Sequence, residues 1–331
     1  YVPDDIFEQY LINLGYDNIL DDSVITADMN TVVYINVSNT NVSSLVGIED
    51  CISLTHLECD DSNISSLDLS NNLLLEYLEC DDINLGVLDI TSNTLLQELS
   101  CSDANLSSLN LSNNLDLEIL NCSNNGIITL DISNNTSLIA LFVSNNNLTE
   151  IDLINYTALE VLSCWENSID TLEVISNPLI HTIFAERNGM KSIILNGIIA
   201  LNRLLLYENQ LTNIDISNTL FSGNFQELDC SNNPQLNQLD LRNGANNYFD
   251  LNSIFCPNLT CINVHDTLFA VAQVVNGDWI IDSQQNFSVS CGAIFGCTDS
   301  LSCNYDTLAT IDDGSCTYPV IWYQTPLLCD G

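Results

Sequence analysis

A repeat of 21 residues runs through most of the chain and restricts its possible folds more than any other feature. An aliphatic residue opens each copy without a change in spacing, at Leu54, Leu75, Leu96, Leu117, Leu138, Leu159, Ile180 and Leu201. Residues 117–135, LEILNCSNNGIITLDISNN, show one copy almost in full. A unit this short cannot bury its apolar residues alone, so the units must stack into a solenoid.

Less regular copies extend the array on both sides. An early copy lies within YINVSNTNVSSLVGI, residues 34–48, and a ninth, FQELDCSNNPQLNQLDLRNG, follows an insertion around residues 222–224. The segment LTCINV, residues 259–264, is a final half-copy. The pattern therefore predicts about eleven rungs over residues 32–264, about 50 Å long at roughly 4.8 Å per rung.

The pattern L-x-x-L-x-C-x-x-N-x-L in these copies resembles the strand segment of leucine-rich repeat proteins, with Cys at the sixth position. The resemblance implies a parallel β-sheet on the concave face. The second half of each copy, LDLS or LDIS, leaves room for a short strand or a turn on the convex face rather than a helix. Asparagines at the ninth position are expected to hydrogen-bond the turns of adjacent rungs; they are Asn125, Asn146, Asn167, Asn188, Asn209 and Asn233.

Cysteine fills the sixth position in six copies, at Cys59, Cys80, Cys101, Cys122, Cys164 and Cys230. Val143, Ala185 and Leu206 occupy the same position in other copies, which indicates a packing role. Cysteine is a small and readily buried residue that suits the thin interior of a solenoid. We therefore expect reduced, unreactive thiols, because parallel strands in register point these side chains in the same direction.

Both ends of the array carry segments that differ from the repeat. VPDDIFEQYLINLG predicts an N-terminal helix that covers the first rung with Ile6, Phe7, Tyr10, Leu11 and Leu14. The four expected regions are an N-terminal helical cap (1–31), the solenoid (32–264), a C-terminal cap (265–292) and a Cys-rich acidic module (293–331).

The C-terminal cap resembles the closing segment of secreted bacterial leucine-rich repeat proteins. Cys261 lies at an outward-facing position and Cys291 follows thirty residues later. We expect these two to form a disulfide, with Cys256 as the competing partner.

The stretch GCTDSLSCNYDTLATIDDGSC, residues 296–316, resembles a module of secreted and surface proteins of gliding gram-negative bacteria, which are often exported by the type IX system. Cys297, Cys303 and Cys316 are expected to form disulfides, which favours an extracellular or cell-surface location. The sequence does not determine which of these cysteines pair with one another. Oxygen ligands for calcium are available from Asp299, Asn304, Asp306, Asp312 and Asp313. The alternative is a plain Asp-Asp-Gly turn on a stapled loop.

Charge excludes several partners. The chain has 44 acidic and 4 basic residues, a net charge of -40. Such a chain repels nucleic acid and anionic lipid. The longest apolar run is far shorter than a membrane span, so no membrane insertion is expected. Catalysis is not expected either, because the sequence contains no metalloprotease or nucleophile-elbow motif.

The third, fifth and seventh positions of each copy point out of the concave face. They are acidic in the early rungs, for example Glu58, Asp60 and Glu79. Rungs five to eight instead carry apolar and basic residues there or just beyond, and we predict a ligand-binding patch of Phe142, Trp165, Phe184, Arg187, Arg203, Leu205 and Tyr207. Solvent-facing aromatic rings beside arginine are typical of binding hot spots. Lateral ring packing across the sheet is the alternative.

The sequence thus predicts a non-catalytic extracellular module for recognition or adhesion, which binds a protein or glycan through its concave face. Calcium is the only cofactor that it suggests. The alternative is a structural module of a surface fibre or appendage, in which self-assembly would be the main interaction.

Overall fold

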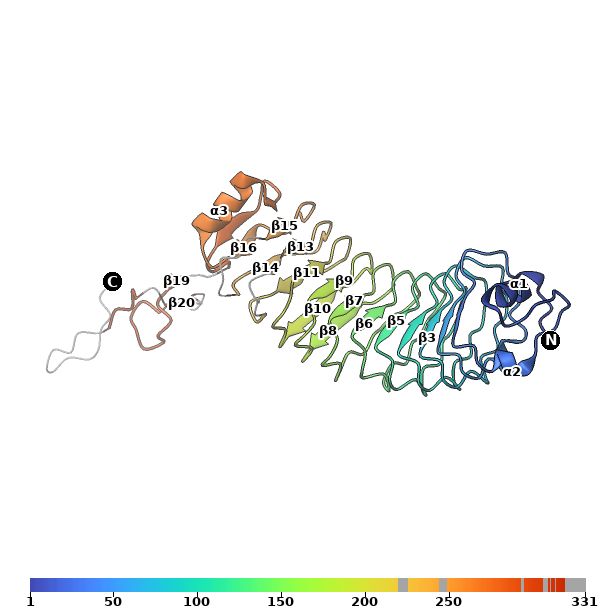
Figure 1. Ribbon diagram of the computed structural model, residues 1–331. Helices are drawn as coiled ribbons and strands as arrows, with labels where there is room; N and C mark the ends of the chain where they lie inside the picture. The colour runs from blue at the N-terminus through green and yellow to red at the C-terminus, as the bar shows by residue number, and fades with distance from the viewer. Residues whose placement is uncertain are drawn as a thin grey trace, which may run out of the picture.

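Successive repeats stack into a continuous array of parallel strands, and this array forms the body of the molecule (Figure 1). Helices α1 and α2 lie at one end of the array, and helix α3 lies at the other. The computed structural model describes residues 1–219, 226–243, 249–292, 295–305, 309, 311–312 and 314–318. The predicted solenoid is confirmed.

The long sheet holds one short strand from each rung, and its strands follow chain order throughout; the numbering skips the strands of the other face. Neighbours pair in parallel at equivalent positions, as in Leu120 with Leu141, so the central residue of each strand is buried on the same side. Its strands are β1 (Tyr34–Asn36), β2 (His56–Glu58), β3 (Tyr77–Glu79), β4 (Glu98–Ser100), β5 (Ile119–Asn121), β6 (Ala140–Phe142), β7 (Val161–Ser163), β9 (Thr182–Phe184), β11 (Arg203–Leu205), β13 (Glu227–Asp229), β15 (Asp250–Asn252) and β17 (Trp279–Ile280).

Strands on the convex face occur only in the later rungs of the described chain. Strands β8 and β10 form one pair, and four more form a separate sheet. The convex face therefore consists of short strands in the later rungs and turns in the earlier ones, as the expectation of short strands or turns allows. These strands are β8 (Thr171–Ile175), β10 (Ser192–Asn196), β12 (Asn213–Asp215), β14 (Gln238–Asp240), β16 (Cys261–Asn263) and β18 (Asn286–Ser288).

A local hydrogen bond limits how far a convex strand extends. In five earlier rungs the Asp or Asn that follows the convex leucine or isoleucine accepts from the N–H two residues later, as Asp131 does from Ser133 at 3.0 Å. This Asx turn competes with the extended backbone. Glu173 and Ile194 replace that residue in β8 and β10, the two convex strands that reach five residues. Where Asp returns, at Asp215 and Asp240, the strand ends.

The predicted asparagine ladder forms on one turn of the solenoid. The amide nitrogen of Asn146 donates to the carbonyls of Cys122 and Val143, and its oxygen accepts from the N–H of Ile127. Asn167, Asn188, Asn209 and Asn233 repeat the arrangement. Each side chain therefore satisfies backbone groups of two rungs, which fixes the spacing between them.

A second column of buried polar residues lies on the opposite turn. Five asparagines each donate to two carbonyls, which lie 21 and 24 residues earlier in the chain; they are Asn72, Asn93, Asn114, Asn135 and Asn177. Tyr156 stands in the same column, and its hydroxyl donates to the carbonyl of Ile132 instead. A tyrosine can replace asparagine there because both present a donor to the preceding rung.

The six cysteines at the sixth position are all buried and free, as are Cys51 and Cys256. The thiols of Cys59 and Cys80 donate to the carbonyls of Glu79 and Ser100 in the next rung. Burial raises the pKa of the Cys122 thiol to about 12, so it stays protonated at neutral pH. The predicted packing role of this column is confirmed.

The N-terminal cap contains α1 (Asp5–Leu14) and α2 (Thr26–Met29), and the 3-10 turn Ile48–Asp50 follows β1 in the first rung. Helix α1 begins at Asp4, whose side chain accepts from two backbone N–H groups, and ends at Gly15. The predicted apolar stripe was partly wrong, because Ile6 and Leu14 are exposed. Glu8 is buried instead, since its carboxylate accepts three N–H groups of residues 21–23.

The C-terminal cap continues the solenoid. LTCINV forms the convex strand β16, while its rung includes β15, a strand that the sequence pattern did not reveal because Tyr248 stands at the position of the opening leucine. After β16, helix α3 (Thr267–Asn276) crosses to β17, and β18 then pairs with β16. The apolar side of α3 and β17 thus closes the array.

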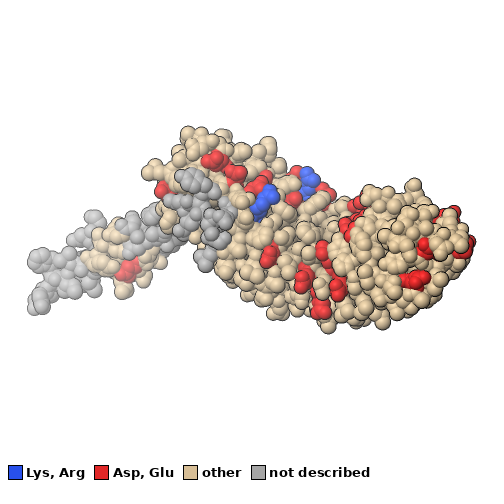
Figure 2. All heavy atoms as spheres, in the orientation of Figure 1, with Lys and Arg blue, Asp and Glu red and all other residues tan. Residues whose placement is uncertain are grey.

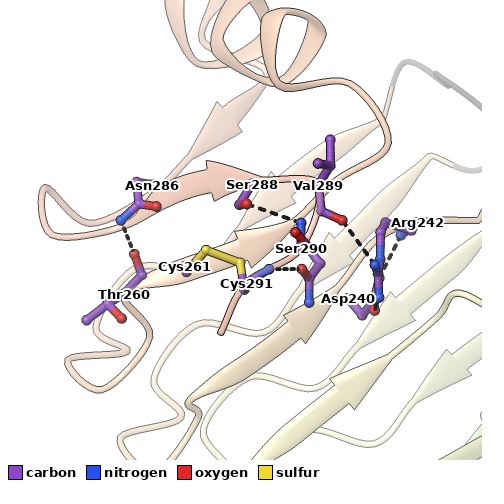
Figure 3. The surroundings of a disulfide bond; sticks show 10 residues. Asp240, Arg242, Thr260, Cys261, Asn286, Ser288, Val289, Ser290 and Cys291 are labelled. Carbon is purple, nitrogen blue, oxygen red and sulfur yellow. Dashed lines mark hydrogen bonds and ion pairs between the residues drawn. A yellow bond between two sulfur atoms is a disulfide. The ribbon is translucent and has the colours of Figure 1, made fainter. Parts of the chain in front are cut away.

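The disulfide between Cys261 and Cys291 ties β16 to the end of this cap, as predicted (Figure 3). Arg242 lies beside it, bonded to the Asp240 carboxylate and the Val289 carbonyl. Cys256, the competing partner, is a free buried thiol.

Beyond the cap, β19 (Phe295–Gly296) pairs with β20 (Ile311–Asp312), and a disulfide joins Cys297 to Cys316. Cys303 is disulfide-bonded as well. In the described part of the chain, no helix has the length and apolar character that a membrane crossing requires.

Candidate binding face

The long sheet presents three columns of side chains to solvent. In β6, Leu141 points into the core while Ala140 and Phe142 point outward, and the third column is formed by the residue two positions after the strand, here Ser144. From β2 to β11 the register does not shift, so residues 21 positions apart stack as neighbours, about 4.8 Å apart. The sequence of each column therefore translates directly into a strip of surface.

The early rungs give this surface an acidic end, as predicted. The Tyr77 hydroxyl donates to Glu79 at 2.7 Å, and its ring stacks on His56. Asp60, Glu79 and Asp81 bring carboxylate oxygens within 4.8 Å of one another. Burial, together with the charges of Glu79 and Asp81, raises the pKa of Asp60 to about 6. Burial also raises the pKa of Asp81 and Glu98.

No basic residue of the chain neutralises that end. Arg187 pairs with Glu166 and Glu208, Lys191 with Asp170, Arg203 with Glu227, and Arg242 with Asp240. These four are all the lysines and arginines that the chain contains. On the face that Figure 2 shows, the blue spheres lie in the later part of the solenoid with red spheres beside them.

A hollow of about 560 Å³ joins the acidic end to the aromatic rungs. Tyr77, Glu79 and Glu98 line it at one end, and Phe142 and Trp165 line it at the other. Hydroxyl and amide side chains form its floor, namely Ser100, Ser102, Asn121, Ser123, Asn124, Ser144 and Ser163. The surface thus offers hydrogen-bonding groups between rings, a combination that suits an extended polar ligand.

The fold brings only part of the predicted ligand-binding patch together. Phe142, Trp165, Phe184, Leu205 and Tyr207 are all half-buried on the outward side of neighbouring rungs. The arginines cover part of the rings, because Arg203 lies 5.4 Å from the centre of Phe184 and Arg187 lies 5.6 Å from that of Tyr207. Only Phe142 and Trp165 line the hollow.

Glu186 is a residue of this face that the sequence reasoning did not select. It lies between Trp165 and Tyr207 in the same column, yet it is only 7% exposed. Its Oε1 is 3.5 Å from the Tyr207 hydroxyl, and its Oε2 is buried without a hydrogen-bond partner. Burial raises the pKa of this carboxyl group. Position in the repeat alone could have indicated an outward acid here, but not its burial.

A second hollow, of about 930 Å³, lies on the convex side where coil gives way to β8. Its lining comes from residues 129–131, 150–155, 157, 171, 173 and 175–176. No sequence signal marked it, because it depends on the change from Asx turns to an extended strand.

The predicted calcium ligands of the C-terminal module are only partly described. Asp299 accepts from the Leu301 N–H and the Tyr318 hydroxyl, and Asn304 bonds to Ser315 and Thr317. The backbone of Asp312 belongs to β20, whereas Asp306 and Asp313 lie outside the described residues. The calcium set stays a prediction.

Comparisons with known proteins bear on the fold. No protein-family model matches the sequence, and no curated protein sequence does. Among solved structures, an internalin from Listeria monocytogenes is 19% identical and covers 86% of this chain and 95% of its own, with a TM-score of 0.52. A leucine-rich repeat protein from Leptospira interrogans is 19% identical over 80% of both chains, with a TM-score of 0.53.

YopM from Yersinia enterocolitica is 21% identical and has a TM-score of 0.51, covering 77% of this chain and 52% of its own. Similarity at this level of sequence identity shows the fold alone. Together with the 21-residue register and the stacked parallel strands, it identifies the fold of this chain as the leucine-rich repeat solenoid of bacterial proteins.

Proposed function

We propose that the chain is an extracellular recognition module that binds a protein or glycan through its concave face and catalyses no reaction. The observation that carries the proposal is the row of half-buried rings at the end of a polar hollow. The core does not require these rings, since the central residue of each strand already fills it. The anchoring residues are those of the predicted patch, with Trp165 at the border of the hollow.

Two features support an extracellular location. The disulfides Cys261–Cys291 and Cys297–Cys316 are of the kind that persists in oxidising compartments. The net charge of -40 keeps a protein soluble and separated from anionic surfaces. The eight buried free thiols do not conflict with this location, because they are protonated and shielded.

The proposed function can be tested by identifying a binding target and then measuring the effect of replacing one aromatic residue. Protein and glycan arrays probed with the soluble chain should identify a target. Trp165→Ala should then weaken binding about 30-fold, since an anchoring aromatic contributes about 2 kcal/mol or more. The melting temperature should change little, because the ring lies on the outward side of the sheet and the core is filled by other residues.

Ile128→Ala is the matched control, because Ile128 is 62% exposed and lies off the long sheet. If Trp165→Ala lowers the melting temperature sharply and binding per folded molecule stays intact, the rings are structural. An ordered assembly of the free chain would instead favour a role as a fibre module.

A further inference from the structure

We propose that the 560 Å³ hollow of the concave face binds a neutral oligosaccharide, whose sugar rings pack on Phe142 and Trp165 and whose hydroxyls bond to the polar floor. This inference rests on the proposed function and narrows it, because it names a glycan rather than a protein as the ligand. Three features of the hollow support it: open polar groups, the character of its floor and charge, and the placement of the two rings.

The open polar groups are the first feature. Ser123, Glu98 and Trp165 all line the hollow and are half-buried. The Ser123 hydroxyl, the Glu98 carboxylate and the Trp165 indole N–H make no hydrogen bond to any other residue that the structure describes. A hydroxyl both donates and accepts, a carboxylate accepts, and an indole N–H only donates. A ligand that matches all three groups must carry donors and acceptors together, as sugar hydroxyls do.

The floor of the hollow is already fixed by bonds among its own side chains. The Ser144 and Ser163 hydroxyls bond to each other at 2.8 Å. The Ser100 hydroxyl donates to Asp81 at 2.8 Å and accepts from the Asn121 amide at 2.9 Å. Each serine oxygen retains acceptor capacity after these bonds, since a hydroxyl oxygen has two lone pairs. The floor therefore offers hydrogen-bonding groups that need no rearrangement to bind a ligand.

The same floor is poorly suited to a protein partner. Protein interfaces obtain most of their affinity from apolar and aromatic anchors that fill pockets. Between Tyr77 and Phe142 the outward lining consists of carboxylate, hydroxyl and amide side chains, with Ile119 as the one aliphatic exception among the described lining residues. An anchor side chain would thus meet polar groups instead of an apolar pocket.

Charge separates a neutral ligand from a charged one. Glu79, Asp81 and Glu98 are the charged residues of the described lining, so acidic glycans are repelled. A lysine or arginine side chain would be attracted, but it offers donors only and leaves the indole N–H of Trp165 unmatched. A neutral sugar meets no repulsion and matches both kinds of group.

The placement of the rings is the third feature. Strands β6 and β7 pair Phe142 with Ser163, and Trp165 occupies the position of Ser144 one rung later. The two rings therefore lie at diagonal corners around the bonded pair of serines. A sugar ring carries C–H groups on its faces and hydroxyls at its rim, so its faces can cover the aromatic rings while its rim meets the polar floor.

The test uses the full chain and neutral hexasaccharides of glucose, mannose, galactose and N-acetylglucosamine, with hexagalacturonic acid as the charged probe. The readout is the NMR signal of the Trp165 indole N–H, assigned with Trp165→Phe. At least one neutral hexasaccharide should shift this signal in a saturable manner, equally at low and high sodium chloride, whereas hexagalacturonic acid should not. Ser123→Ala should weaken this binding about fivefold, because one hydrogen bond to the ligand is lost.

Ser108→Ala is the matched control, because Ser108 is exposed and does not line the hollow. Melting temperatures check that both serine variants are folded. The proposal is overturned if none of the neutral hexasaccharides shifts the indole signal, or if Ser123→Ala binds as tightly as Ser108→Ala. A response to acetyl-Gly-Lys-Gly-amide that fades at high salt, with none to the hexasaccharides, would instead assign the hollow to a basic protein segment.

The array experiment separates this inference from the proposed function. A protein target whose binding is lost in Trp165→Ala, together with no response to the hexasaccharides, supports concave-face recognition and rejects the glycan. Unchanged target binding in Trp165→Ala rejects the patch itself.

Discussion

At the scale of single residues, the two asparagine columns show how the repeat uses polar groups inside a thin core. The ninth-position asparagines use both their amide nitrogen and their oxygen. In the opposite column, Asn72, Asn93, Asn114, Asn135 and Asn177 use only the nitrogen, and their oxygens are buried without partners. Replacement by a hydroxyl, as at Tyr156, therefore costs this second column little, whereas the first column requires an amide.

The cysteine column gives a prediction for a single substitution. Cys101→Ser should lower the free energy of unfolding by about 1–3 kcal/mol, because it places a hydroxyl in a fully buried apolar position. Cys101→Val should cost less, since Val143 occupies the equivalent position in another rung. Denaturant unfolding of both variants measures the difference. Rapid labelling of the native thiols would show that the column is open to solvent and would contradict the packing role.

The acidic rungs predict an unusual response to pH. The pKa of Asp60 is raised to about 6 in the folded chain from its ordinary value of 3.8, mainly by burial. Its ionised form therefore destabilises the fold above about pH 6, and this penalty disappears as pH falls from about 6 toward 4. Asp60→Asn should stabilise the chain at pH 7 by about 1 kcal/mol, a value reduced for solvent screening near the surface.

Thermal melts at pH 7 and pH 5 test this expectation. The gain from Asp60→Asn should be present at pH 7 and smaller at pH 5. A gain that is the same at both values would mean that Asp60 is not the titrating group. Asp68→Asn is the control, since the pKa of that exposed carboxyl is lowered by its bonds to Ser70.

At the scale of elements, the C-terminal cap depends on a covalent link. Each rung contacts only its neighbours, so stability is distributed along the array and the ends open first. The Cys261–Cys291 bond closes 30 residues of chain around α3 and β18. Cys261→Ser with Cys291→Ser should therefore destabilise the cap by about 2–4 kcal/mol.

Hydrogen exchange measures this effect by region. Amides of β16 and β18 should exchange faster in the double variant, while amides of β3 to β6 should keep their protection. Equal loss of protection along the whole solenoid would show that it unfolds as a single cooperative unit.

At the scale of the whole molecule, the net charge of -40 dominates the response to salt. Like charges repel one another and destabilise the folded chain at low ionic strength, so sodium chloride should raise the melting temperature. Calcium should raise it further than magnesium at matched ionic strength if the C-terminal module binds calcium. Identical responses to the two ions would leave only screening and would remove the proposed ligands Asp299, Asn304, Asp306, Asp312 and Asp313.

The repeat pattern is sufficient to predict the solenoid, its rung spacing and its buried columns. A strict 21-residue period forces equivalent residues into register, so the period alone places Leu120, Cys122 and Asn125 in their columns. The same period predicted which residues line the outward face, including Phe142 and Trp165. Local signals that do not depend on distant contacts also placed the helix after Asp4.

The burial and the ion pairs of the outward side chains, by contrast, could be known only from the folded structure. Periodicity assigns Arg203 and Glu186 to that face in the same way and places Arg187 just beyond it. The two arginines pair with other carboxylates, whereas Glu186 is buried and its Oε2 has no hydrogen-bond partner. The folded structure also decided that β8 and β10 are strands while residues 150–154 are not, because that choice depends on an Asx turn competing with pairing to the next rung. Register follows from the sequence, but burial and pairing depend on which neighbours the folded rungs bring together.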